Sequence, residues 1–467
     1  FADPQIWQAL PATLISTLLA VGGALLISLT LVAALWPSRG WRQLAGRLPL
    51  LLAVPHVAFA TGALLLFAEG GWLYRVCSVC SPPADRYGIG LGLTMAIKES
   101  GFLLWAIYGL LSEKRLAEQA TVLKSQGYGR WQCLNWLILP TLLPSLAIVL
   151  VATTAWSLST VDVALVIGPG NPPTLAVLAW QWLNQGDDMQ QAKGALASLL
   201  LLLILGGVLV CAWGGWRLWQ RQIPDLRGIR RPQPRALAGR LLAIGLPLSG
   251  LLCALLLAAL AQSASPLNDS LANSLGLALL ASLAGALVCL LWLECGPSRG
   301  DSWVWLPLVL PALPLADGQY QLALYTWQDG QFATVLWGHL LWVVPWMLFV
   351  LRPAWRHRDP RLELVARTLG WGRWQRVWRV KLPMLVRPLL MALAVGFSVS
   401  IAQYLPTLWL GAGRTPTLTS EAVALSSGGD TQTLAAQALW QLLLPAMVFS
   451  LTALLAWLAG RYRRGLR

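Results

Sequence analysis

The chain has 467 residues, of which 57% are hydrophobic and only 11% are charged, and this composition excludes an ordinary soluble globular protein. Its formal net charge of +15 could suggest an acidic partner such as nucleic acid. Most of the basic residues, however, fall in loops on one side of the predicted membrane helices, so the charge reports orientation and argues against nucleic-acid binding.

Apolar windows long enough to cross a membrane, which takes about 20 residues, recur along the whole chain. If the chain crosses the membrane at each of these windows in turn, most of the Lys and Arg residues fall in loops on one side of the membrane. Positive charge resists export, so we expect these loops and the C-terminus in the cytoplasm. The predicted fold class is an all-α polytopic membrane protein. The eleven predicted helices span residues 10–36, 48–68, 89–111, 137–158, 195–216, 241–261, 273–294, 303–325, 333–351, 384–403 and 433–459.

Two cysteines in the motif CSVC, Cys77 and Cys80, fall together in an outer loop. Two thiols are too few for a zinc site, so no metal is expected. A structural or incidental role is favoured over a functional one. Whether the two are bonded to each other stays open.

Ionisable side chains interrupt two of the windows. Such groups are costly at membrane depth, so they usually line a cavity or bond one another. Lys98 and Glu99 lie near the middle of the window 89–111, and as adjacent residues they do not face each other on a helix. Asp317 interrupts the window 303–325, together with Gln319 and Gln321. For Glu99 and Asp317, lining of a pathway and ion pairing with Lys98 are equal alternatives.

Two histidines, His56 and His339, also lie within the predicted helices. A hydrogen bond between helices is the favoured interpretation of both. Because Glu99 and Asp317 come from non-equivalent helices of the two halves, the predicted translocation pathway is asymmetric and acidic and favours a cationic or hydrogen-bonding solute. Its candidate residues are Lys98, Glu99, Asp317, Gln319 and His339. Glu294, at the cytoplasmic end of its helix, is assigned no special role.

The chain contains a long internal repeat. GYGRWQ at 127–132 and GWGRWQ at 370–375 match at an offset of 243 residues, and the register continues without a gap to GPGNPPTL at 168–175 and GAGRTPTL at 411–418. Both copies have the same orientation, so each unit needs an even number of helices. We therefore expect two six-helix units, with the first helix of the first unit before residue 1. The predicted domains are a first half at 1–219, a basic cytoplasmic linker at 220–240 and a second half at 241–467.

The repeated phrase follows a short amphipathic segment in each copy. In PRLELVARTLG, apolar residues recur at i, i+3, i+4 and i+7, and EKRLAEQATVLKSQG is similar. Gly127 and Gly370 then supply the dihedral angles that end one helix and turn into the next. Each loop is predicted to hold a short helix lying across the cytoplasmic face. Such a helix could rest on lipid, but duplication with unchanged spacing favours docking onto two copies of one partner.

A cytoplasmic loop with this spacing, from an acidic and alanine-rich segment through Gly to Leu-Pro, resembles the signature loop of binding-protein-dependent ABC importer permeases. Two such loops in one chain resemble the fused permeases of the thiamine and ferric-iron transport group, and the segment LGAGRTPTLTSEA strengthens the likeness. The acidic residues depart from the family pattern, because Thr121 and Leu364 stand where an acid is expected. The resemblance implies ATPase docking through Glu118, Gly127, Arg130, Glu363, Ala366, Gly370 and Arg373.

The resemblance also implies partners. It implies a bacterial inner-membrane permease with two copies of a separate ATPase subunit, a periplasmic solute-binding protein and a small hydrophilic solute. No G-x-x-x-x-G-K-[ST] motif occurs in the sequence, so the chain itself is not expected to bind ATP, to act as an enzyme or to need a cofactor. The alternatives are a secondary transporter with parallel six-helix repeats and a membrane scaffold that transports nothing.

Overall fold

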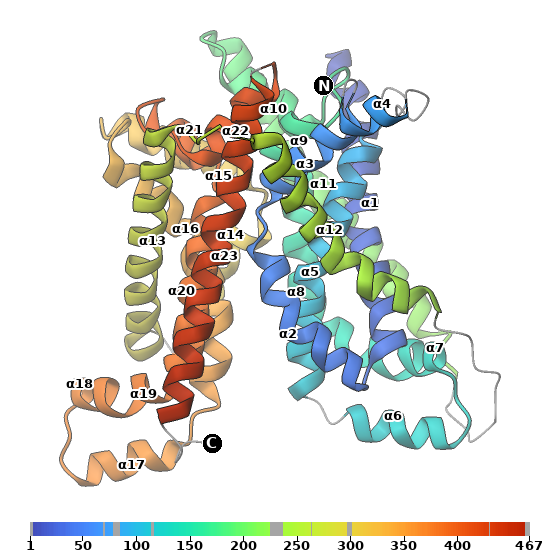
Figure 1. Cartoon of the computed structure of the whole chain (residues 1–467), viewed down its shortest axis with the longest axis vertical. Helices are drawn as coiled ribbons and strands as arrows, with labels where there is room; N and C mark the ends of the chain where they lie inside the picture. Colours follow the sequence, from blue (N-terminus) through green and yellow to red (C-terminus); the bar gives the residue numbers. More distant parts are fainter. Residues whose placement is uncertain are drawn as a thin grey trace.

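The computed structural model describes residues 3–68, 71–77, 85–113, 116–224, 237–262, 264–296, 301–428 and 430–462. Every regular element in these ranges is a helix, and the predicted all-α class is confirmed (Figure 1). Eight described helices are long and apolar enough to cross a membrane. A ninth crossing results if the bent pair Arg373–Met384 and Val386–Ile401 is counted as one.

The first half of the chain runs from α1 to α11. A long helix opens this half and another closes it, and short helices connect the spans at both ends. The bounds are α1 Pro4–Leu35, α2 Arg39–Ala53, α3 His56–Phe67, α4 Trp72–Val76, α5 Ile89–Glu113, α6 Leu116–Ser125, α7 Arg130–Cys133, the π-helix η2 Leu134–Ile138, α8 Leu139–Ser159, α9 Asp162–Ile167, α10 Leu175–Leu183 and α11 Asp188–Gln220.

The second half begins with α12, which packs against α23 and crosses to α1 and α3 of the first half. Its remaining elements follow the order of the first half. The bounds are α12 Leu237–Ala261, α13 Asn268–Cys295, the 3-10 helix η3 Asp301–Trp305, α14 Leu306–Val309, α15 Ala312–Tyr325, α16 Phe332–Arg356, α17 Pro360–Thr368, α18 Arg373–Arg376, the π-helix η4 Val377–Lys381, α19 Leu382–Met384, α20 Val386–Ile401, α21 Leu405–Gly411, α22 Leu418–Ser426 and α23 Thr431–Tyr462.

The sequence repeat reappears as a repeat of elements. The offset of 243 residues maps α5 onto α16, η2 onto η4 and α10 onto α22, each from its first residue to its last. Side-chain contacts repeat too. The backbone N–H of Leu175 donates to Thr13 Oγ1, and that of Leu418 donates to Ser274 Oγ, both at 2.8 Å. The two copies therefore share their architecture as well as their sequence.

Two of the eleven predicted helices are broken in the structure. Residues 48–68 divide between α2 and α3, and residues 303–325 divide among η3, α14 and α15. A proline disfavours the helical conformation of the residue before it. Val54 before Pro55 and Leu310 before Pro311 accordingly adopt extended conformations. The apolar character of these windows was read correctly, but the expectation of one continuous helix in each was wrong.

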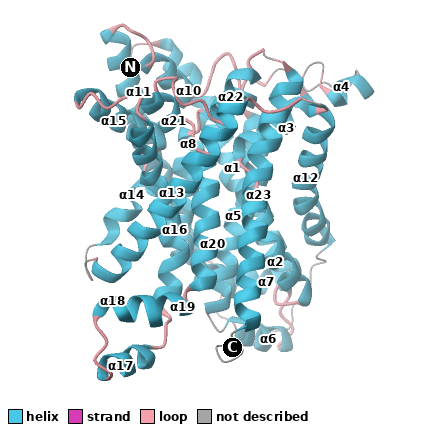
Figure 2. Cartoon of the chain, turned by 60° about the vertical axis from the view of Figure 1, so that its left-hand side comes forward, coloured by secondary structure: helices cyan, strands magenta, loops and turns pink. Residues whose placement is uncertain are grey.

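The two loop helices α6 and α17 lie at the same end of the molecule, and α10, α21 and α22 lie at the opposite end (Figures 1 and 2). Close helix packing depends on small residues in places. A Cβ atom on Gly62 of α3 would stand 2.5 Å from Cys253 Sγ of α12, so this approach between the halves requires glycine. Cys77 is disulfide-bonded, and Cys80 lies outside the described residues.

Candidate functional site

The repeated phrase builds the same turn in both halves. Gly127 and Gly370 adopt φ angles of 96° and 78°, which L side chains rarely adopt, as the sequence predicted. Two residues later, the N–H of Gly129 donates to Gln132 Oε1 at 2.8 Å, and that of Gly372 donates to Gln375 Oε1 at 3.0 Å. The second glycine and the glutamine therefore cap the short helix that follows each turn.

The arginine of the phrase fixes the loop to the transmembrane bundle. Arg130 donates to the carbonyl oxygen of Ala34, at the end of α1. Arg373 donates likewise to the carbonyl oxygen of Glu294, at the end of α13. Carbonyl groups at a helix C-terminus carry partial negative charge and lack helical partners. Both arginines, expected among the docking residues, thus bond the chain's own helices.

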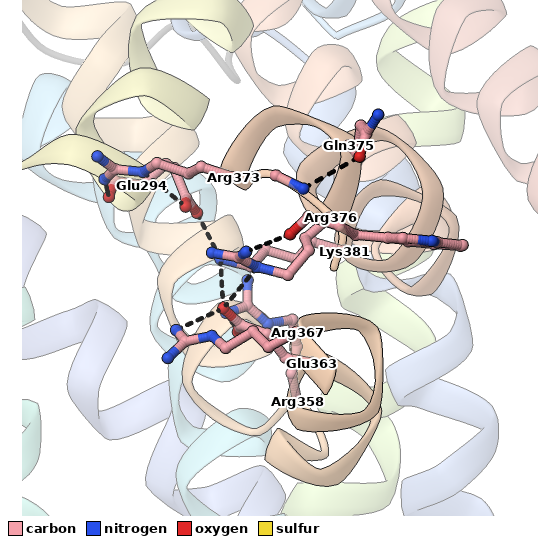
Figure 3. Close-up of polar contacts among 10 residues, drawn as sticks. Glu294, Arg358, Glu363, Arg367, Arg373, Gln375, Arg376 and Lys381 are labelled. Carbon is pink, nitrogen blue, oxygen red and sulfur yellow. Dashed lines mark hydrogen bonds and ion pairs between the residues drawn. The ribbon is translucent and has the colours of Figure 1, made fainter. Parts of the chain in front are cut away.

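Glu363 occupies the middle of a cluster of basic side chains in the second loop (Figure 3). Its Oε1 lies 3.0 Å from Arg367 Nη2 and 3.3 Å from Lys381 Nζ. Arg358 and Arg376 approach the same carboxylate at 4.0 and 3.7 Å. Burial alone would raise the pKa of Glu363, but the hydrogen bond from Arg367 and the charge of Lys381 outweigh it and lower this pKa. The carboxylate therefore holds α17 against η4.

Lys381 extends this cluster to α13. Its Nζ lies 2.6 Å from Glu294 Oε2, and Glu294 also accepts a hydrogen bond of 3.1 Å from Arg373 Nε. The side chains of Lys381 and Glu294 are only 7% and 6% exposed, so this is a buried ion pair. Glu294, to which the sequence analysis gave no role, joins the end of α13 to the second loop.

The first loop is held differently. Its helix α6 packs through apolar side chains of its own, because Leu116, Ala120 and Leu123 are buried. Glu118 is exposed on α6. Among the described residues, α6 itself thus rests on hydrophobic contact where α17 rests on charge.

The outer surface of α17 carries exposed apolar side chains beside the exposed Arg361 and Arg367. Ala366, expected as a docking residue, is buried against the chain itself. Leu362 and Val365 are exposed, and Leu369 just beyond the helix is 66% exposed. On α6, Val122 is the large apolar residue that is exposed. An exposed apolar face at this end of the molecule is a candidate contact surface for a partner.

A cavity of about 160 Å³ lies between the two halves. His56, Lys98 and Glu99 contribute its ionisable lining, and Glu99 Oε1 lies 2.7 Å from His56 Nε2. Aromatic residues make up much of the wall: Phe102, Trp105 and Trp156 from the first half, and Trp342 and Trp346 from the second.

The other candidate pathway residues lie away from this cavity. Asp317 is partly buried on α15, where Gln321 donates a hydrogen bond of 3.4 Å to it. Gln319 is buried, and neither of its amide atoms has a hydrogen-bond partner among the described residues. His339 is buried on α16 between Ser400 and Thr407, at 2.8 Å from each hydroxyl. Asp317, the expected second carboxylate, is thus not among the described residues that line the cavity, which include one acid, one amine and one imidazole.

Asp162 is a buried carboxylate that the sequence analysis did not consider. Thr160 Oγ1 donates to it at 3.0 Å, and both residues line a space of about 20 Å³ toward the end opposite α6 and α17. Asp162 falls between two apolar windows, so a search for charges inside windows passes over it. A short segment of strongly apolar residues around it, TVDVALVI, was the available signal.

Two hydrogen bonds join the halves at this opposite end. The backbone N–H of Ala312 donates to Ser159 Oγ at 2.9 Å. The indole N–H of Trp409 donates to Asn184 Oδ1 at 3.0 Å. The halves therefore meet directly beyond the cavity.

Comparison with known proteins identifies a family and two relatives of the chain. Residues 301–464 match the family described as "Binding-protein-dependent transport system inner membrane component". The whole chain is 59% identical to the inner membrane ABC transporter permease protein YnjC of Escherichia coli strain K12, 91% of which is covered. It is also 27% identical, over 86% of its length and 78% of the relative, to the thiamine transport system permease protein ThiP of the same organism.

Proposed function

The chain belongs to the family of inner-membrane permease components of binding-protein-dependent ABC transporters, and we propose that it carries solute between its two halves under the drive of a separate ATPase bound at α6 and α17. It is a multi-pass membrane transport protein, and membership in the family sets aside the secondary-transporter and scaffold alternatives. The proposed halves are residues 1–219 and 241–467, joined by the linker 220–240, of which 225–236 lie outside the described residues.

The single observation that carries the docking proposal is the exposed apolar surface of α17. A membrane protein gains nothing by exposing Leu362, Val365 and Leu369 to the aqueous cytoplasm unless a partner or lipid covers them. Several of the loop's cations are paired with Glu363 and Glu294. Since α6 lies at the same end, two copies of one ATPase subunit could contact the two loop helices together (Figure 1).

We further propose that the cavity is the solute pathway and that the docking end is cytoplasmic. The cavity draws its lining from both halves, so a rocking motion between them would change its access. A periplasmic binding protein would deliver a small solute at the end that carries α10, α21 and α22 (Figure 2). The mixed lining of one acid, one amine and several indoles supports no charge preference for that solute.

Co-purification tests the docking proposal. The chain is expressed with its ATPase subunit, and retention of the ATPase is compared among the parent, Leu369→Glu on the second loop and Val122→Glu on the first. Each variant is expected to weaken retention about tenfold or more, because a charge enters an apolar contact. Gln222→Glu, an exposed residue after α11 that receives the same charge, is the matched control.

Two results would contradict the proposal. One is full retention of the ATPase when both loops carry the added charge. The other is hydrolysis of ATP by the purified chain alone. If the α17 surface rests on lipid, Leu369→Glu would change association with lipid vesicles and leave ATPase retention at the parental level.

A further inference from the structure

The two loop helices are anchored by residues of opposite chemical character at equivalent positions. At the offset of 243 residues, Glu363, Arg376 and Lys381 correspond to Ala120, Cys133 and Ile138. Glu294 corresponds to Ala34, because these two residues supply the carbonyl oxygens that accept from Arg373 and Arg130. We call Glu294, Glu363, Arg376 and Lys381 the ionic set. At the equivalent positions the first half has four buried apolar residues, Ala34, Ala120, Cys133 and Ile138.

The ionic set connects three parts of the second half. Lys381 lies in η4, which leads through α19 into α20, and α20 lines the cavity with Val395 and Ser398. The same ammonium group bonds Glu294 at the end of α13 and Glu363 on α17 (Figure 3). These ion pairs therefore couple a displacement of α17 to α20, which lines the cavity, and to α13, which packs against α20.

We propose that Glu294, Glu363 and Lys381 are positioning residues that hold the second docking helix by charge, whereas the first docking helix is held by apolar packing. The proposal rests on the docking role of α6 and α17 proposed above. One chain would then transmit ATPase movement through two unlike anchors, one made of buried ion pairs and one made of hydrophobic contact.

The physical signature of such an anchor is the difference between single and paired substitution. Removal of one member of a buried ion pair leaves its partner uncompensated, whereas replacement of both by apolar residues can be nearly neutral. The first half supplies the apolar replacements, since Ala34, Ala120 and Ile138 stand at the positions of Glu294, Glu363 and Lys381. Lys381→Ile is therefore the single variant. The paired variant replaces both ion pairs of Lys381 and combines Glu294→Ala, Glu363→Ala and Lys381→Ile.

Amide hydrogen exchange of the purified chain in detergent tests the anchor without an ATPase. In Lys381→Ile, the amides of α17 are expected to exchange about tenfold faster than in the parent, while those of α6 keep the parental rate. The paired variant and Lys381→Arg are expected to return α17 toward the parental rate. Ile138→Val, at the equivalent position of the first half, is the control and is expected to leave α17 unchanged.

A second arm measures the assembled transporter. ATPase subunits should still bind Lys381→Ile through α6, but the stimulation of ATP hydrolysis by the periplasmic binding protein should fall, and the paired variant should restore it. The proposal is overturned if Lys381→Ile leaves exchange in α17 at the parental rate, or if the paired variant exchanges as fast as the single one. Failure of the parental chain to bind any ATPase would instead refute the docking role, and the exchange measurement would still decide the anchor.

Discussion

Substitution of His339 should loosen the contact between α16 and the α20–α21 segment. Thr407 Oγ1 donates to the carbonyl of Gln403 at 3.0 Å, so it can only accept from His339 Nε2–H. His339 Nδ1 is then unprotonated and accepts from the Ser400 hydroxyl. His339→Leu removes both hydrogen bonds while it keeps a side chain of similar bulk.

The expected loss of stability follows from two bonds between membrane helices. Such bonds contribute about 0.6 kcal/mol each on average and up to about 1.7 kcal/mol, so His339→Leu should cost about 1–3 kcal/mol. His339→Gln should cost less, because its amide nitrogen can still donate to Thr407. Thr407→Val should cost more than Ser400→Ala, because it leaves a buried N–H without an acceptor.

Thermal unfolding of the purified chain in detergent measures these differences, and the double variant of His339→Leu with Ser400→Ala closes a thermodynamic cycle. A positive coupling between the two positions is expected, since each substitution removes the same bond. Equal unfolding temperatures for parent and His339→Leu, or strict additivity in the cycle, would refute the assigned bonds.

Three further predictions concern the cavity and the loops. Glu99→Gln should lower transport into proteoliposomes by roughly tenfold or more, because it removes a charged hydrogen bond in the cavity lining. Asp317→Asn should transport at the parental rate. A loss of transport in both variants would contradict this prediction. Gly370→Ala should cost about 1–2 kcal/mol at its positive φ and speed proteolysis after α17, while Gly372→Ala, with a negative φ of −63°, should change proteolysis little. The pKa of Glu363 lies below its ordinary value of 4.5, so its stabilisation of α17 is complete above pH 4.5 and is lost as the pH falls through the lowered pKa. Hydrogen exchange, corrected for the intrinsic rate, should therefore show faster exchange in α17 and not in α6 on acidification. An equal response of both helices would count against the charged anchor.

Local signals in the sequence were enough for the repeat, the loop helices and the turns at Gly127 and Gly370, because each depends on residues close together in the chain. The breaks at Pro55 and Pro311 follow from the proline rule, but the apolar count of each window concealed them. An apolar window of about twenty residues indicates that a segment lies in the membrane. It does not show that the segment is one continuous helix.

Contacts between distant elements were beyond such signals. Glu294 and Lys381 are 87 positions apart, and each alone looks like an ordinary residue near a membrane boundary. Glu99 lines the cavity between the halves, whereas Asp317 occupies a short helix that packs mainly against α21. The sequence gives no means of choosing between these two carboxylates, because the face that each presents depends on how the halves meet.

The hydrogen bonds of Ser159 and Asn184 across the halves contribute only about 1–3 kcal/mol together, so thermal motion will often break one of them. The narrow space beside Ser159 is bordered by apolar side chains such as Trp156 and Trp342, and also by the polar side chains of Thr160, Asp162 and Gln403. Apolar side chains in a constriction hinder the passage of ions because they expel water. We therefore expect the electrical tightness of the membrane at this point to depend on how closely the indole rings of Trp156 and Trp342 approach, as well as on the two polar contacts between the halves.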